Sequence, residues 1–231
     1  MTLPVTEIFG PTIQGEGPDT GVPAAFLRLS GCNLTCSWCD TPWTWDLTRY
    51  DLWSEVTDMS AEHIAERVAA MDVDRLVITG GEPMIHQSSP EWAHLLDCIR
   101  KIGISVDIET NGTLAPLHDS RIRSWVVSPK LSSSGTDPRR ALKPLVLARF
   151  VDLALRGRAV FKFVCGSPQD VAEVAKFAEG IPTDRVWISP LGTTPEQVAA
   201  STAAVADAAI NCRYRLGTRL HILAWGNERG H

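Results

Sequence analysis

The chain has 231 residues, and 44% of them are hydrophobic, which is enough to fill the core of one large domain. The formal net charge is −5 and both signs are scattered along the chain, which argues against a protein that binds nucleic acid through a basic surface. There is no apolar stretch of about 18 residues and no basic start followed by an apolar run, so we expect neither a membrane span nor a signal peptide.

Short apolar runs alternate with helical patterns. In chain order, we expect strands at residues 24–30, 75–83, 104–113, 124–130, 159–167, 185–192 and 219–225. We expect helices at residues 60–71, 91–103, 168–179 and 195–209. The remaining long segments are an N-terminal extension at 1–23, an ordered loop at 40–59 and a loop-rich connection at 131–150. This order predicts one α/β domain over residues 1–231, with a mostly parallel sheet, helices on one face, and full or partial closure into a barrel.

Several predicted strands end in a polar segment that contains glycine or proline. These segments are SGCN, TGGEP, ETNGT, SPK and ISPLG. Because the C-terminal ends of parallel barrel strands share one rim, where such folds place their active sites, we expect one functional site at that rim.

The six cysteines are too few for a disulfide framework in a chain of this length. Three are clustered within residues 32–39, whereas Cys98, Cys165 and Cys212 lie far apart. We therefore expect a reducing cytoplasm and assign no ligand role to the three isolated cysteines.

Cys32, Cys36 and Cys39 form the pattern C-x3-C-x2-C with no fourth cysteine nearby. Structural zinc usually takes four ligands from two cysteine or histidine pairs, and the nearest histidine, His63, lies in a predicted helix. A [4Fe–4S] cluster fits better, because three thiolates bind three irons and leave the fourth iron open for another ligand. A zinc-stabilised binding module without catalysis remains the alternative from another class.

Two motifs resemble those of the radical S-adenosylmethionine (SAM) enzymes. Trp38 is the aromatic residue in C-x3-C-x-aromatic-C, and GGEP at residues 80–83 resembles the strand end that binds the amino group of SAM. The resemblance implies that SAM chelates the open iron and is cleaved by one electron, releasing a radical that abstracts hydrogen from the substrate. A Gly-Gly strand end lets backbone oxygens approach an ammonium group, and Glu82 adds a carboxylate.

The block EIFGPTIQGEGPDTGVPAAFLRLSGCN, with CDTPWTW and ETNGT, is similar to the 7-carboxy-7-deazaguanine synthases, and the similarity extends from Glu7 to His221. It implies a lyase that converts 6-carboxy-5,6,7,8-tetrahydropterin to 7-carboxy-7-deazaguanine and ammonia, in queuosine and 7-deazapurine biosynthesis. The implied cofactors are a [4Fe–4S] cluster, SAM and Mg²⁺, and the implied fold is a reduced, incomplete TIM-type βα barrel. The implied partners are a small pterin, a reductant such as flavodoxin or ferredoxin, and a second copy of the chain, with no nucleic acid or membrane.

The resemblance also assigns substrate-binding positions. A guanidinium suits the substrate carboxylate, because its planar fork can donate two parallel hydrogen bonds. A tight turn at QGEG, a rim salt bridge at the arginine and a plain strand histidine are the structural alternatives. The implied substrate residues are Ile13, Gln14, Gly15, Glu16, Arg28, Thr79 and His221.

Mg²⁺ and SAM positions follow from the same resemblance. Thr41 matches a hydroxyl ligand of Mg²⁺, which often completes its coordination with waters and substrate oxygens. Glu109 and Asn111 are expected at the same rim without assigned roles. The implied SAM residues are Trp38, Gly81, Glu82, Ser128, Pro129, Lys130, Ser189, Pro190, Leu191 and Gly192.

Three features depart from the family. Arg219 and Ser189 stand where glutamine is common, and the chain continues past His221 through AWGNERGH, so a contact from a terminal carboxylate is in doubt. A second enzyme hypothesis is an activating enzyme that makes a glycyl radical on a protein partner. The block from QGEG to Arg28 argues against it, because it suits a small polar heterocycle.

Overall fold

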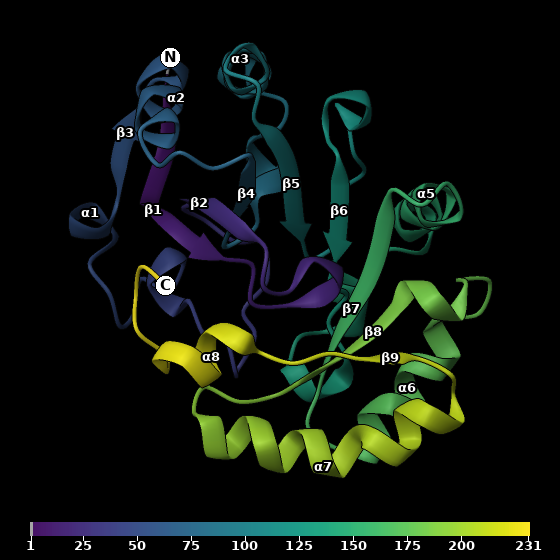
Figure 1. The fold of residues 1–231 in the computed structure, drawn as a ribbon. Coiled ribbons are helices and arrows are strands. Elements are labelled where there is room, and N and C mark those ends of the chain that lie inside the picture. Colours follow the sequence, from purple (N-terminus) through teal and green to yellow (C-terminus); the bar gives the residue numbers. More distant parts are fainter. Residues whose placement is uncertain (1) are drawn as a thin grey trace.

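The computed structural model describes residues 2–231, which form one curved sheet with helices around its outside (Figure 1). The strand order is β3-β1-β2-β4-β5-β6-β7-β8-β9. The strands are β1 Leu3–Ile13, β2 Pro23–Leu29, β3 Thr57–Met59, β4 Arg75–Gly80, β5 Ser105–Thr110, β6 Ser124–Val127, β7 Ala159–Cys165, β8 Val186–Pro190 and β9 Arg215–Leu216. The helices are α1 Leu52–Glu55, α2 Ala61–Ala69, α3 Pro90–Lys101, α4 Pro138–Ala141, α5 Pro144–Leu155, α6 Pro168–Phe177, α7 Pro195–Asn211 and α8 Leu220–Trp225.

The sheet is parallel from β2 to β9, and β1 pairs antiparallel with both β2 and β3. The order ends at β3 on one side and β9 on the other, so the sheet is open and the barrel is partial. This confirms the predicted α/β class and the incomplete barrel. Within the described residues 2–231, no helix is long and apolar enough to cross a membrane.

The alternation of side chains along β7 shows how the two faces of the sheet differ. Phe161, Phe163 and Cys165 point to the helix side and belong to the main core, where each is at most 1% exposed. Lys162 and Val164, one position out of phase, point to the inner side. Burying each phenylalanine contributes about 1.5–3 kcal/mol, so the outer face fixes the strand while the inner face is left for polar side chains.

The predicted helices begin where their capping residues lie. Ser60, Ser89, Ser167 and Thr194 each accept a hydrogen bond from a backbone N–H in the first turn of the following helix. Such caps satisfy donors that have no partner inside the helix and stabilise it by about 1 kcal/mol. These helices confirm the predicted ones, with no end shifted by more than two residues.

Four segments differ from the prediction. Residues 1–23 contain the long strand β1, which the sequence hides because glycine and proline at positions 10 and 11 interrupt it; a register shift between Phe9 and Thr12 accommodates them. Residues 40–59 contain α1 and β3 as well as loop, and residues 131–150 contain α4 and the start of α5. Residues 219–225, predicted as a strand, form α8 instead, because only one side of the segment is buried, at Arg219 and Ile222 three residues later.

Candidate active site

A cavity of about 680 Å³ opens where the parallel strands end. The lining includes the ends of β4, β5, β6, β7 and β8, so the segments TGGEP, ETNGT, SPK and ISPLG do share one rim, as the pattern predicts. This volume lies in the range of pockets that hold small molecules and cofactors.

Cys32, Cys36 and Cys39 line one side of this cavity, and each sulfur has its own hydrogen-bond partner. The backbone N–H of Leu34 donates to Cys32 Sγ (3.4 Å), and the indole N–H of Trp45 donates to Cys39 Sγ (3.3 Å). The hydroxyl of Thr136 donates to Cys36 Sγ (3.7 Å). Donors aimed at sulfur stabilise thiolates and tune a metal bound to them.

The cysteine loop is also tied to the segment after β6. The backbone N–H of Ser37 donates to the carbonyl of Ser134 (2.9 Å), and the indole N–H of Trp38 donates to the carbonyl of Ser133 (3.1 Å). These contacts hold the loop that carries the three sulfurs against a segment about 100 residues away. The loop is therefore ordered by contacts that the local motif does not contain.

The arrangement fits a cluster better than a single zinc ion. Around tetrahedral zinc, with Zn–S of about 2.3 Å, neighbouring sulfurs lie about 3.8 Å apart. Among the described residues 2–231, the sulfurs of Cys32, Cys36 and Cys39 are not all within 4.8 Å of one another. Burial raises the pKa of the Cys32 thiol to about 11, a value that a bound metal would lower.

The GGEP turn packs directly on the start of the cysteine loop. A Cβ at Gly81 would lie 2.1 Å from the carbonyl oxygen of Gly31, and the backbone N–H of Glu82 donates to that same oxygen (2.8 Å). The glycine therefore permits close approach of two backbones, which adds a packing reason to the expected approach of SAM.

We expected Glu82 to offer its carboxylate to SAM, and the structure uses it differently. The side chain is fully buried and accepts hydrogen bonds from the backbone of Met84 (3.0 Å), the hydroxyl of Thr110 (2.8 Å) and the backbone of Asn111 (2.6 Å). Burial raises its pKa. Glu82 thus joins the ends of β4 and β5 beneath the cavity.

The other predicted SAM residues divide into two groups. Lys130 donates to Ser128 Oγ (2.9 Å), and its ammonium lies 5.5 Å from the centre of the Trp38 ring. Pro129, Ser189 and Pro190 are not part of the cavity lining, although the Ser189 hydroxyl points toward it and donates to Glu16 Oε2 (3.5 Å). The predicted SAM residues that line the cavity are Trp38, Gly81, Ser128, Lys130, Leu191 and Gly192.

The seven predicted substrate residues all line the cavity, opposite or beside the cysteine loop. Gln14 and Thr79 both donate to the carboxylate of Glu109, at 3.0 Å and 3.3 Å. A Cβ at Gly15 would lie 1.9 Å from Nδ1 of His221, so the QGEG loop and α8 are packed against each other. Burial lowers the pKa of His221, which keeps the ring neutral at pH 7.

Arg28 is not free. Its Nε donates to Glu7 Oε2 (2.9 Å), and the guanidinium lies 5.8 Å from the centre of the Phe9 ring. The salt-bridge alternative for Arg28 therefore holds in this structure, although the residue still lines the cavity. A substrate carboxylate would have to share this arginine with Glu7.

Glu16 belongs to an ionic network, which we define as Glu16, Lys162, Arg219 and Asp40; the first three are buried, and the Asp40 side chain is 39% exposed. Lys162 Nζ lies 2.5 Å from Glu16 Oε2, and Arg219 Nε lies 2.7 Å from Glu16 Oε1. Arg219 also donates to the Asp40 carboxylate and to the backbone carbonyl of Gly192. The ionic network thus joins the QGEG loop, β7, the end of the cysteine loop and the end of β8.

The network balances two cations against two anions in a mostly buried setting. Burial alone would raise the pKa of Glu16, but Lys162, Arg219 and His221 outweigh it and hold that pKa well below 4.5. Burial likewise opposes the charge of Asp40, whose pKa Arg219 lowers. Both oxygens of Glu16 are already paired, so it holds the QGEG loop in place; it also lines the cavity, and its contact with substrate stays a prediction.

Thr41 lies between the cysteine loop and the network. Its hydroxyl is 3.7 Å from Cys39 Sγ, and it lines the cavity directly after Asp40. A hydroxyl beside a carboxylate, facing a polar cavity, is consistent with a Mg²⁺ site that is completed by water and substrate oxygens.

The C-terminal tail, to which the sequence assigned no role, forms a further wall of the cavity. Residues 227–231 line the cavity. Arg229 Nε lies 2.6 Å from Glu7 Oε1 and Nη2 lies 2.9 Å from Glu55 Oε2, while the guanidinium covers the ring of Trp43 at 4.6 Å. Glu7 therefore bridges Arg229 in the tail to Arg28 at the site.

Sequence reasoning missed several lining residues. One signal was available for Lys162: a lysine inside the apolar run AVFKFVC must be paired if the strand is buried. The tail and the first strand gave no such signal. The missed residues include Glu7, Phe9, Trp43, Lys162, Arg219 and Arg229.

Comparisons with known proteins agree with this geometry. Residues 27–126 match the Radical SAM superfamily. A 7-carboxy-7-deazaguanine synthase of Pyrobaculum aerophilum is 38% identical over 98% of this chain and 96% of its own length, and one of Halobacterium salinarum is 34% identical over 97% and 91%. The crystal structure of QueE from Escherichia coli matches 96% of this chain and 95% of its own, with a TM-score of 0.71 and 29% identity.

A more distant structure, Streptococcus suis SuiB bound to its precursor peptide, has a TM-score of 0.53 at 16% identity and shares the fold alone. By contrast, the archaeal relatives match almost end to end at over 30% identity. The match therefore covers the cysteine loop, the QGEG loop and the helix that carries His221. The chain belongs to the 7-carboxy-7-deazaguanine synthase family of radical SAM proteins.

Proposed function

We propose that this protein is a radical SAM lyase that converts 6-carboxy-5,6,7,8-tetrahydropterin to 7-carboxy-7-deazaguanine with release of ammonia. The observation that carries the proposal is that the three cysteines and the QGEG loop with Arg28 face one cavity. The product belongs to the pathway to queuosine and other 7-deazapurines, and we expect the enzyme to work in the cytoplasm, where free thiols persist.

Cys32, Cys36 and Cys39 would hold the [4Fe–4S] cluster. When bound, the cluster and SAM supply one-electron chemistry that ends in hydrogen abstraction from the substrate. Lys130, stacked against Trp38, and the backbone at Gly81 offer groups of the right charge and shape for the amino-acid end of SAM. The sulfur donors Leu34 N–H, Trp45 and Thr136 hold the three ligands in place.

Gln14, Thr79 and Glu109 would bind the pterin. Their hydrogen bonds to one another make a polar wall with donors and acceptors at fixed positions, which suits the edge of a pterin ring. Arg28 would attract the substrate carboxylate and share it with Mg²⁺ at Thr41. The Asp40 carboxylate, fixed by Arg219, keeps the Thr41 segment against the cavity.

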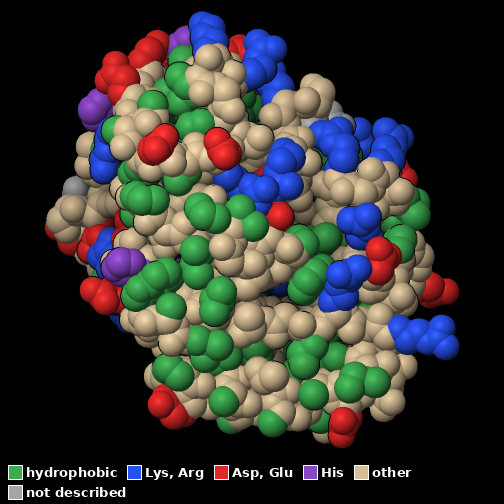
Figure 2. Space-filling model, in the orientation of Figure 1, with side chains coloured by type: hydrophobic (Ala, Val, Ile, Leu, Met, Phe, Trp, Pro, Cys, Tyr) green, Lys and Arg blue, Asp and Glu red, His purple; other side chains and the backbone are tan. Residues whose placement is uncertain are grey.

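A reductant such as flavodoxin or ferredoxin and a second copy of the chain remain part of the proposal. Figure 2 shows that most charged side chains on this face lie above α7, while the lower surface over α7 is mainly uncharged. Ile210 on α7 is 68% exposed, and Leu145 on α5 is 89% exposed. A homodimer would cover such apolar side chains, and sedimentation at several protein concentrations would detect it.

The activating-enzyme alternative is disfavoured by the tail. Residues 227–231 cover one side of the cavity and Arg229 fastens them to Glu7 and Glu55, which suits enclosure of a small molecule better than entry of a protein loop. A zinc-binding module is disfavoured by the spacing of the sulfurs.

One experiment separates the three functions. The protein is reconstituted anaerobically with iron and sulfide and then given SAM, a reductant, Mg²⁺ and carboxytetrahydropterin. The proposal predicts a reducible cluster, SAM cleavage and the deazaguanine product. SAM cleavage without that product would favour the activating enzyme, whereas the lack of a reducible cluster would sink both enzyme hypotheses.

A further inference from the structure

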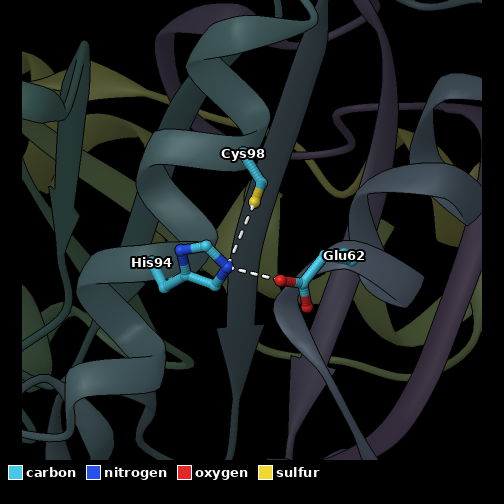
Figure 3. Close-up of side chains that lie close together, drawn as sticks. All are labelled: Glu62, His94 and Cys98. Atoms are coloured by element: carbon cyan, nitrogen blue, oxygen red, sulfur yellow. Dashed lines mark hydrogen bonds and ion pairs between the residues drawn. The ribbon is translucent and has the colours of Figure 1, made fainter.

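A second group of metal-ligand side chains lies on the outer face, away from the cavity. Glu62 on α2 and His94 and Cys98 on α3 point toward one another (Figure 3). His94 Nε2 is 2.6 Å from Glu62 Oε1 and 3.8 Å from Cys98 Sγ, and the three ligand atoms all lie within 4.8 Å of one another. Cys98 thus adds a third ligand atom beside the ion pair of Glu62 and His94.

The backbone holds these side chains in register. His94 and Cys98 are four residues apart on α3, so they lie on one face of the helix, one turn from each other. Glu62 is in the first turn of α2, and the backbone N–H of its neighbour Ala61 donates to the buried carboxylate of Glu91 on α3 (2.7 Å). This hydrogen bond fixes the start of α2 against the start of α3 and thereby fixes the spacing across the group.

The distances suit a zinc ion. With Zn–N of about 2.0–2.1 Å and Zn–S of about 2.3 Å, nitrogen and sulfur around tetrahedral zinc lie roughly 3.6 Å apart, close to the observed 3.8 Å. The carboxylate oxygen would have to move less than about 1 Å from the nitrogen, which the 59% exposed Glu62 side chain can do by rotation. Exposure of Glu62 and of His94 (44%) also leaves a route for the ion and room for a water ligand.

The surrounding charges favour a cation. Glu62, Asp97 and Glu91 each add negative potential at Cys98, and Lys101 opposes them. Asp97 is itself paired with Arg100 and Arg121 at 3.3 Å and 3.4 Å, so Glu62 supplies the main charge at the group. An imidazole and a thiolate select zinc and similar borderline ions over Mg²⁺ or Ca²⁺, which prefer oxygen ligands.

We propose that Glu62, His94 and Cys98 bind one Zn²⁺ ion, or a chemically similar divalent ion, which joins α2 to α3. The three residues lie outside the cavity lining, so this site is separate from the proposed function and does not depend on it. The ion would cross-link two outer helices that pack on the first half of the sheet, and it would keep the Cys98 thiol from reacting.

The test measures zinc bound to the full-length, cluster-loaded enzyme after anaerobic equilibration at micromolar free zinc, without SAM or substrate. We expect one zinc per chain in addition to the cluster iron, and a rise in the unfolding temperature. His94→Ala should lose the zinc, and Cys98→Ser should weaken its binding tenfold or more. Cys212→Ser, a matched cysteine control away from the group, should keep it.

Cobalt provides a second readout that identifies the ligand. In the full chain with Cys32, Cys36 and Cys39 replaced by alanine, Co²⁺ should produce a sulfur-to-cobalt charge-transfer band that Cys98→Ser removes. The proposal is overturned if the wild-type enzyme retains no zinc. It is equally overturned if His94→Ala and Cys98→Ser bind zinc as the wild type does, or alter the unfolding temperature by the same amount with and without zinc.

Discussion

The two sides of the cavity are built in different ways. The cysteine side is one continuous loop whose three sulfurs receive hydrogen bonds from neutral donors. The other side is the ionic network, which meets the end of the cysteine loop at Asp40; its members Glu16, Lys162, Arg219 and Asp40 come from four separate segments and neutralise one another. The three sulfur ligands are thus supplied by one short local motif, although distant neutral groups such as Thr136 support them, whereas the position of the substrate loop depends on long-range pairing of charges.

The largest effect is expected for Cys36→Ala, which removes one of the three cluster ligands. We expect cluster iron and product formation to fall below detection, because a site with two thiolates cannot hold the cluster. The fold should persist, since Cys36 is only partly buried. Iron content and thermal unfolding measure the two effects. Cys212→Ala is the matched control, and retention of a full cluster in Cys36→Ala would contradict the ligand assignment.

The ionic network is broken most directly by Arg219→Met. Removing the guanidinium leaves the buried Glu16 with Lys162 as its one cation and leaves Asp40, which is 39% exposed, without its ion pair, so we expect the free energy of unfolding to fall by about 3 kcal/mol. Urea denaturation of the cluster-free protein measures it. Arg215→Met is the control: this exposed arginine stacks on Trp187 at 5.5 Å, and its loss should cost no more than about 1 kcal/mol. Equal effects of the two changes would contradict a special role for the network.

These two sides also explain how much the sequence could predict. The C-x3-C-x2-C spacing and the polar strand ends predict the cluster loop and its rim, because they depend on nearest neighbours and on the geometry of parallel strands. The partners of Glu16 could not be predicted, since Lys162 and Arg219 lie 146 and 203 residues away along the chain. Arg219 is noticeable in sequence only as a departure from the glutamine that is common in the family.

The structure of the C-terminal segment also could not be predicted from the sequence. Residues 219–225 are apolar enough for either a strand or a helix, and tertiary contacts decide in favour of α8. The tail beyond it has no periodicity, and its position across the cavity depends on tertiary contacts such as those of Arg229 with its two acidic partners and the stacking of His231 on Trp225.

Thr41→Ala tests the proposed Mg²⁺ ligand, which lies between the cysteine loop and the ionic network. We expect the Mg²⁺ concentration that gives half-maximal activity to rise roughly tenfold or more, because one ligand is lost, while cluster iron stays unchanged. Thr193→Ala is the control, since Thr193 also lines the cavity but donates to Gln197 (3.3 Å). An unchanged metal dependence would show that Thr41 is not a ligand.

The pH dependence of stability tests the charges assigned to the carboxylates of the ionic network. The pKa values of Glu16 and Asp40 are lowered in the folded protein, so these carboxylates stabilise it above their unfolded values near 4 and lose that effect as the pH falls. The stability difference between wild type and Glu16→Gln should therefore stay constant from pH 7 to about pH 4.5 and shrink below that by up to about 1.4 kcal/mol for each pH unit. Urea denaturation across this pH range measures it, and a difference that stays constant below about pH 4.5 as well would contradict the assigned charges.

The smallest effect is expected for Arg229→Gln, which loosens the tail. Its two ion pairs are partly exposed and contribute roughly 0.2–1 kcal/mol each, so the apparent KM for the pterin should rise a few-fold while kcat is nearly unchanged. Arg149→Gln, an exposed change on α5, should alter neither constant. A fall in kcat without a change in KM would argue that the tail does more than hold the substrate in the cavity.

In the proposed function, both sides of the cavity serve one reaction on one pterin. That function is tested most directly by the stoichiometry of turnover in the anaerobically reconstituted enzyme, followed by mass spectrometry together with an ammonia assay. We predict one 7-carboxy-7-deazaguanine and one ammonia for each carboxytetrahydropterin consumed, with none formed by Cys36→Ala. Consumption of SAM without matched release of both products would contradict the account.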